Sequence, residues 1–108
     1  GVFSLENGFT INLFVDRVIL QVSTETSGAC TLDIGFASGS TALGDDLIDR
    51  LDVSSQGVFD NIDEQGDLGA SVGYWAASGD KYLTASMKTG ATSGLVGFYA
   101  IHCILVEA

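Results

Sequence analysis

Alternating hydrophobic and polar residues predict a chain made of β-strands. The clearest case is the segment CTLDIGF (residues 30–36), in which every second residue is hydrophobic and the residues between are Thr, Asp and Gly. Because successive side chains of a strand point to opposite faces, this pattern predicts a half-buried strand. Residues 11–15 and 18–22 alternate in the same way and predict two further strands, which Asp16 and Arg17 separate.

The longest hydrophobic run, GLVGFYAIHCILV (residues 94–106), is apolar at both odd and even positions. A strand that is apolar on both faces needs cover on both faces. We therefore expect either a central strand of a sheet or a strand with one face against another subunit. A buried helix is the competing interpretation, but the aromatic and β-branched residues and the flanking Gly94 and Gly97 favour a strand.

The remaining segments predict shorter strands and one irregular stretch. Residues 58–59, 72–76 and 81–88 are expected as strands, with turns at residues 78–80 and 90–94. Residues 38–55 break the alternation. The hydrophobic residues in this stretch are Leu43, Leu47, Ile48 and Leu51, and their spacing predicts a loop with a short helical piece.

Together these elements predict one all-β domain, an antiparallel jelly-roll-like β-sandwich of seven or eight strands. The chain has 108 residues, with 14 Gly and no Pro, which suits a single domain of short strands and glycine turns. We expect residues 1–8 to form an N-terminal arm and residues 9–108 to form the sandwich.

The arm and the last strand predict self-association. Val2, Phe3 and Leu5, together with the final strand, offer more apolar surface than one small sandwich covers. We therefore expect a stable homo-oligomer, with a trimer favoured over a dimer, and we take these three residues as candidate interface residues.

The charge excludes several classes of partner. Four basic residues stand against fourteen acidic residues, a formal net charge of −10. Nucleic acids and anionic membranes are bound through clustered Lys and Arg, so neither is an expected partner. No signal peptide is visible in the sequence, so none is expected. No transmembrane helix is expected either, because no apolar run reaches about 20 residues.

A weak catalytic pattern is present. GASVG (residues 69–73) matches the GxSxG motif, and Asp80 and His102 follow Ser71 in the hydrolase order. That motif works at a turn from strand to helix in a parallel sheet, which this sequence does not predict. Gly and Ser are also common here, so we expect no catalytic residues and no enzyme activity. A small hydrolase would require a reactive Ser71.

The cysteines, the histidine and the acidic residues are the candidate metal ligands of this sequence. Cys30 and Cys103 lie in hydrophobic segments, and both are expected to be reduced and buried. A disulfide between them is the alternative if their strands are neighbours. His102 is the only histidine and is adjacent to Cys103, so no zinc site is expected. We predict no metal and no cofactor.

The acidic residues gather in one region. Eight of the fourteen lie between Asp45 and Asp67, and the order Asn61, Asp63, Gln65, Gly66 is similar to the start of an EF-hand loop. The twelfth position is Val72 instead of Glu, so a solvated acidic loop is favoured, and calcium binding by this segment is left open.

Trp75 and Tyr74 would form a sugar platform if exposed, but aromatic residues beside strands are more often core.

Several segments resemble one protein family. In chain order, these segments are GACTLDIGF (28–36), LIDRLDV (47–53), FDNIDEQGDLG (59–69), GDKYLTAS (79–86) and TGATSGLVGFYAIH (89–102). They resemble, in matching order, segments of the small capsid decoration (cement) proteins of tailed bacteriophages, which have a jelly-roll β-sandwich. These motifs are turns and core strands without chemistry, so no binding residue carries over.

The resemblance implies a non-enzymatic virion protein on the outer surface of the capsid. Its expected partners are the major capsid protein and further copies of itself. A net charge of −10 suits the outer surface better than the DNA-facing inner one. The alternative is a carbohydrate- or receptor-binding jelly roll of a phage fibre or head fibre.

Overall fold

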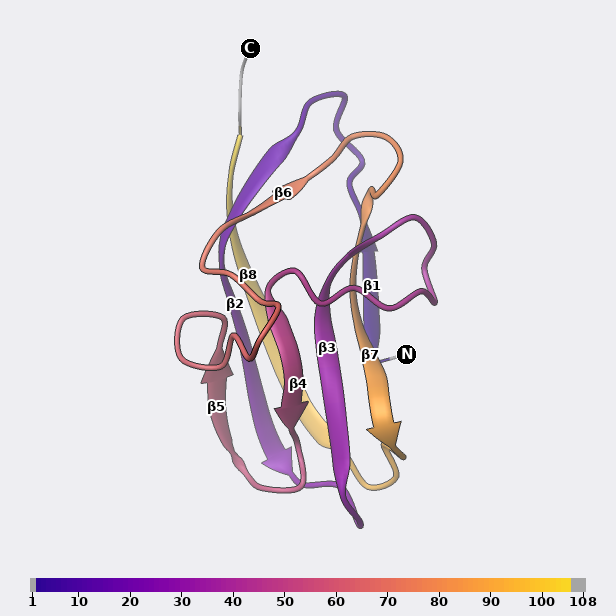
Figure 1. The fold of residues 1–108 in the computed structure, drawn as a ribbon, viewed down its shortest axis with the longest axis vertical. Coiled ribbons are helices and arrows are strands. Elements are labelled where there is room, and N and C mark those ends of the chain that lie inside the picture. Colours follow the sequence, from indigo (N-terminus) through magenta and orange to yellow (C-terminus); the bar gives the residue numbers. More distant parts are fainter. Residues whose placement is uncertain (1, 106–108) are drawn as a thin grey trace.

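The computed structural model describes residues 2–105, which form eight β-strands and no helix (Figure 1). The strands are β1 (Phe3–Glu6), β2 (Leu13–Thr24), β3 (Cys30–Ala37), β4 (Ile48–Asp52), β5 (Gly57–Asp60), β6 (Gly73–Trp75), β7 (Tyr82–Gly90) and β8 (Val96–Leu105). All pairings are antiparallel. The predicted all-β sandwich is confirmed, and this part of the chain has no helix long and apolar enough to cross a membrane.

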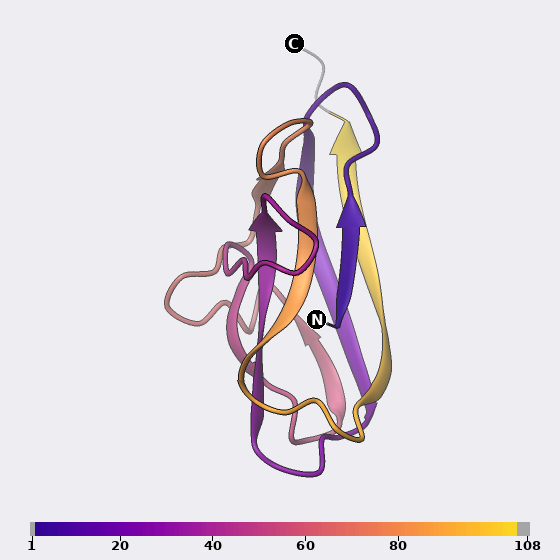
Figure 2. The same ribbon diagram turned by 90° about the vertical axis from the view of Figure 1, so that its right-hand side faces the viewer.

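The strands form two layers that are visible edge-on in Figure 2. Sheet A has the order β1-β7-β3-β4. In sheet B, β2 is the central strand, with β8 on one side and β5 and β6 on the other. Most connections pass from one sheet to the other, as in jelly rolls, and the result is an elongated molecule of 45 × 24 × 23 Å.

The core lies between the sheets. β2 and β3 supply alternate, fully buried residues to it, among them Val15, Val18, Leu32 and Ile34. Full burial of one such side chain contributes about 1.5–3 kcal/mol. Trp75 closes one end of the core, and its indole Nε1 donates a hydrogen bond of 2.7 Å to the carbonyl of Lys81.

β2 is one strand, although the sequence predicted two. The register with β8 shifts between Val15 and Arg17, so Asp16 sits in a β-bulge. The bulge adds one residue, and Val15 and Val18 therefore both face the core although they are three positions apart. The prediction of two separate strands, residues 11–15 and 18–22, is therefore wrong, and β2 begins at Leu13 instead of Ile11.

The helical piece predicted within residues 38–55 is wrong, because Ile48–Asp52 form strand β4. Here too a register shift, between Leu32 and Ile34 of β3, breaks the alternation, and Arg50 has a φ of 61°. Residues 38–47 are a loop, as expected. The loop lies on the outer face of sheet A, where Thr84 Oγ1 donates a hydrogen bond of 3.0 Å to the carbonyl of Ala42.

The final strand is not central. β8 pairs only with β2 among the described strands, so it is an edge strand of sheet B. Of the two predicted alternatives for this segment, the central strand is wrong. Contact of one face with another subunit stays a prediction.

The N-terminal segment is extended, as expected for an arm, but it is part of the sandwich. β1 pairs with β7 at the edge of sheet A, and it lies beside β8 (Figure 2). The N-terminal arm is therefore held by its own chain in this structure.

Candidate functional site

The outer face of sheet B is rich in exposed hydrophobic residues. Leu13, Val15, Leu20 and Val22 of β2 are buried in the core, so the alternate residues Phe14 and Gln21 face outward. Tyr74 of β6 and Ile104 of β8 flank Phe14, and Val58 of β5 and Phe98 of β8 flank Gln21. These four flanking side chains are all more than half exposed.

These residues define two cross-strand rows on the outer face of sheet B: Tyr74–Phe14–Ile104 and Val58–Gln21–Phe98. The Phe14 and Tyr74 rings are 4.3 Å apart between centroids and tilted by 33°. The outer face of a sandwich sheet is normally polar. Contiguous exposed apolar patches are typical of surfaces that bind proteins, membranes or ligands.

Two charged pairs lie on sheet B between the rows. Arg17 forms a salt bridge of 2.8 Å with Asp60, and His102 Nδ1 lies 2.5 Å from Asp16 Oδ1. The hydrogen bond from His102 lowers the pKa of Asp16, and the backbone N–H of Asp63 is the main group that lowers the pKa of Asp60. An apolar surface with charge pairs at fixed positions suits a specific contact, because misplaced charges disfavour other orientations.

The outer edge of β8 is a second feature of this surface. β8 has ten residues, VGFYAIHCIL, with no Lys and no Pro, and the described chain places no strand beyond it. Edge strands are usually shortened, charged or covered, because their free N–H and C=O groups pair with other strands. The edge of β8 therefore offers a place for a strand of another chain.

The three predicted interface residues lie beside β8. Val2, Phe3 and Leu5 are half-buried and pack against the core of their own chain. Val2 also lines a groove of about 340 Å³ with Leu95, Val96 and Phe98. Their role in an interface stays a prediction, and the more exposed hydrophobic residues on this side of the molecule belong to β8.

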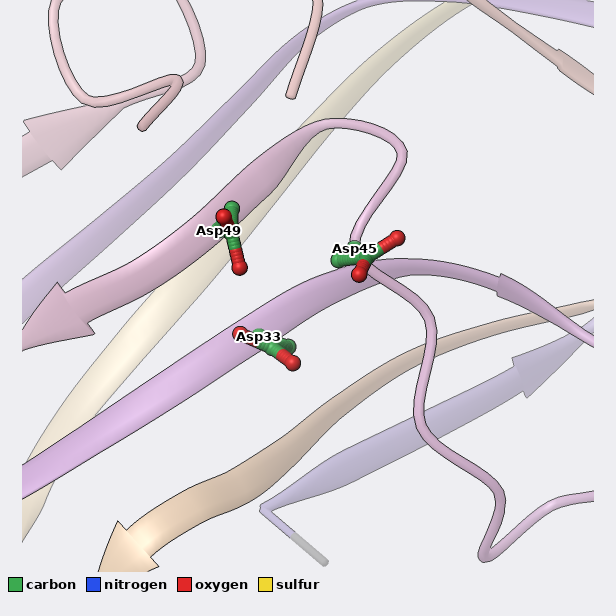
Figure 3. Close-up of side chains that lie close together, drawn as sticks. All are labelled: Asp33, Asp45 and Asp49. Atoms are coloured by element: carbon green, nitrogen blue, oxygen red, sulfur yellow. The ribbon is translucent and has the colours of Figure 1, made fainter. Parts of the chain in front are cut away.

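A cluster of three aspartates is on the opposite layer. Asp33 of β3, Asp45 of the 38–47 loop and Asp49 of β4 each bring a carboxylate oxygen to within 4.8 Å of the other two (Figure 3). Asp33 and Asp49 are only 1% and 5% exposed, and Asp45 is half-buried. Asp33 Oδ1 also accepts a hydrogen bond of 2.9 Å from the backbone N–H of Arg50.

Two glycines bring the 38–47 loop onto this cluster. A Cβ at Gly35 would lie 2.5 Å from the backbone N of Asp46, and one at Gly44 would lie 2.6 Å from the backbone of Phe36. The two backbones therefore meet where no side chain fits between them, and Asp45 is held over β3. Burial raises the pKa of Asp33, and the charges of Asp49 and Asp45 raise it further.

The EF-hand-like segment has a different arrangement. Asn61 is fully buried: its Oδ1 accepts a hydrogen bond of 2.9 Å from Val18 N–H, and its Nδ2 donates to the carbonyls of Ala70 and Ser71. It fixes the loop 61–72 to β2 and is not available as a ligand. Asp63 and Asp67 are exposed in this loop. The aspartate cluster instead joins Asp45 and Asp49 of the acidic segment to Asp33, which the sequence analysis missed.

The remaining candidate residues are spread over the fold. Ser71 lies exposed in the loop 61–72, and the carboxylate that contacts His102 belongs to Asp16 instead of Asp80. Trp75 is buried, so of the possible sugar platform only Tyr74 is exposed.

Both cysteines are free. Cys30 is buried in sheet A, as predicted, but Cys103 is exposed on β8 in sheet B. Burial of Cys103 was therefore predicted wrongly, because β8 is an edge strand.

Comparisons with protein-family models, with curated proteins and with solved structures find no match. The resemblance to capsid decoration proteins thus stays a prediction from the sequence motifs.

Proposed function

We propose that this protein is a non-enzymatic structural protein of a phage virion: a capsid decoration protein that binds the outer surface of the head and stabilises it as a homo-oligomer. The resemblance of its motifs supports the class of protein. The observation that carries the proposal is the hydrophobic outer face of sheet B, bordered by the edge of β8 that no described strand covers. Both features suit protein–protein assembly.

The composition of this surface supports a specific interface. Protein interfaces combine an apolar, aromatic-rich centre with polar groups, and a stable one buries about 800 Å² per partner. The outer face of sheet B has the aromatic residues Phe14, Tyr74 and Phe98, and its charged pairs restrict the orientation of a partner.

Self-association follows from the same features. Antiparallel pairing of two β8 edges around a two-fold axis gives a dimer, whereas contact of the apolar face with a different surface of the next copy closes into a ring, such as the favoured trimer. An oligomer contacts several copies of the major capsid protein at once. Contacts that are individually modest then add up to strong binding.

The first experiment measures association directly. Light scattering on the purified chain at micromolar concentration should give the mass of a trimer or a dimer, and Phe98→Glu should reduce it to that of a monomer. Leu43→Glu is the matched control, because Leu43 is also exposed but lies in the loop on sheet A. A monomeric wild-type chain, or equal effects of the two variants, would contradict association through sheet B.

The second experiment measures the function. Heads that lack the protein should release DNA at a lower temperature than complete heads, and adding back the wild-type chain should restore the difference. Phe98→Glu should bind and restore less than Leu43→Glu. If heads with and without the protein release DNA at the same temperature, the stabilising role is wrong.

A receptor-binding role is the second candidate, and the exposed Tyr74 ring against Phe14 favours it. Such a ring pair is able to stack on a sugar. This role predicts that glycans bind the isolated chain and that Tyr74→Ala abolishes this binding. If the chain binds heads but no glycan, the receptor-binding role is wrong and only the decoration role remains.

A further inference from the structure

We propose that Asp33, Asp45 and Asp49 form a binding site for a hard divalent cation, Ca²⁺, which fastens the 38–47 loop to the outer face of sheet A. This site lies on the sheet opposite the proposed assembly surface and does not depend on that function. Its three carboxylates come from a strand, a loop and a second strand (Figure 3).

The spacing of the carboxylates fits one ion. Ca²⁺ takes oxygen ligands at about 2.4 Å, so ligands on opposite sides of the same ion are about 4.8 Å apart. The three carboxylate oxygens all lie within 4.8 Å of one another. They can therefore share a single cation without a rearrangement of the strands that carry them.

Among the described residues, no buried side-chain cation pairs with these three carboxylates. Arg50 Nε is 3.9 Å from Asp49 Oδ1, and the Arg50 side chain is 62% exposed. Lys88 of β7 acts on Asp33, but it is exposed too. Because Asp33 and Asp49 are almost completely buried, their charges are costly unless a cation or protons compensate them.

An independent observation comes from Ser86 of β7. Ser86 is directly opposite Asp33 in the β3–β7 pairing, and its neighbour Ala85 is in the core, so Ser86 projects from the same outer face as Asp33. Ser86 is only 4% exposed, and its Oγ is fully enclosed without a hydrogen-bond partner. A buried hydroxyl without a partner is rare, and this one lies on the residue paired with Asp33, where an additional oxygen ligand could come from.

The ligand set favours Ca²⁺ over Mg²⁺. Ca²⁺ accepts six to eight oxygens in irregular geometry, from carboxylates, hydroxyls, backbone carbonyls and water. Mg²⁺ requires a nearly ideal octahedron and retains most of its water. An enclosed site with three carboxylates on separate segments therefore meets the requirements of Ca²⁺ more readily than those of Mg²⁺.

The test uses the full chain, freed of metal with a chelator and dialysed. Calorimetric titration with CaCl₂ should show one Ca²⁺ per chain. The Tm from circular dichroism should rise on the order of 10 °C at a Ca²⁺ concentration about 100 times the dissociation constant. MgCl₂ should give a smaller shift, and NaCl at the same ionic strength should give none.

Two aspartate variants separate the site from general charge effects. Asp45→Asn keeps an oxygen at a half-buried position but removes one of the three negative charges, so it should weaken the Ca²⁺ response strongly. It should also raise the Tm of the metal-free chain, because it relieves repulsion. Asp63→Asn makes the same charge change in the exposed loop 61–72 and should respond to Ca²⁺ as the wild type does. The proposal is overturned if the wild type does not bind Ca²⁺, in which case protons neutralise the cluster, or if Asp45→Asn keeps the full Ca²⁺ response.

Discussion

Phe3 and Tyr99 stack on each other, with ring centroids 3.9 Å apart and planes only 16° from parallel. Phe3 belongs to β1 at the edge of sheet A, and Tyr99 belongs to β8 at the edge of sheet B. The pair therefore joins the two sheets on the side where neither edge strand has a further neighbour among the described strands. It holds the N-terminal segment against the strand that we propose for assembly.

This contact predicts different effects for two phenylalanines. Phe3→Ala should lower the free energy of unfolding by about 1–2 kcal/mol, because it removes a half-buried ring and its stacking partner. Phe98→Ala should change it by less than about 0.5 kcal/mol in the monomer, because the Phe98 ring is exposed. Urea denaturation at low protein concentration measures both. Equal losses would show that Phe3 contributes no more to the fold than a surface residue.

Asn61 predicts a large effect of a single polar substitution. Asn61→Ala should destabilise the chain by about 2–3 kcal/mol, because it leaves the buried N–H of Val18 and two carbonyls without their side-chain partner. Asn12→Ala is the control: Asn12 Oδ1 also accepts a backbone hydrogen bond, from Ala77, but in an exposed position. Denaturation midpoints compare the two, and a loss for Asn61→Ala no larger than that of the control would refute the structural role.

Asp33 predicts a pH dependence of the metal-free chain. Its pKa is raised above the ordinary 3.8 by burial and by Asp49 and Asp45, against the opposing effects of the Arg50 N–H and Lys88. The unfolded carboxyl then ionises at lower pH than the folded one, so its contribution to stability is lost as pH rises through the folded-state pKa.

The measurement is the free energy of unfolding at several pH values from about pH 4 to about pH 7. Asp33→Asn keeps the Oδ1 acceptor for the Arg50 N–H but cannot ionise. Its stability relative to the wild type should therefore increase with pH. A difference that stays constant over this range would mean that Asp33 titrates normally.

The two cysteines predict two different reactivities. Burial, and secondarily the charge of Asp52, raises the pKa of the Cys30 thiol, and Cys103 is exposed. A thiol reagent should modify one cysteine per native monomer rapidly and the second only after unfolding. Mass spectrometry identifies the labelled residue, and rapid labelling of Cys30 would contradict the burial of β3. Slower labelling of Cys103 at high protein concentration would support association through β8.

The fold class could be predicted because most strands alternate regularly, as in residues 30–36. Errors arose where one added residue interrupts the alternation. Asp16 made β2 look like two strands, and the bulge at β4 gave Leu47, Ile48 and Leu51 a helical spacing. The edge position of β8 was also hidden, because hydrophobicity on both faces describes a central strand and an associating edge strand equally well.

The candidate sites were harder to predict than the fold. Asp33 is on the polar side of an amphipathic strand, so the alternation of hydrophobic and polar residues predicts that it is exposed. Its burial results from the 38–47 loop, which closes over β3 where Gly35 and Gly44 meet. In the same way, the two hydrophobic rows of sheet B become visible only when the register of four strands is known.

The pairing of β2 with β8 has a consequence for how the chain folds. The residues it joins are far apart in sequence, 73 positions for Ser23 and Val96 and 86 for Asp16 and His102. The ribosome therefore completes β2 long before the strand that covers one of its sides exists. Small β-rich proteins with such distant contacts fold in about milliseconds to seconds, more slowly than helical ones. During synthesis, the apolar residues of β2 are thus exposed for longer than those of any strand whose partner follows directly.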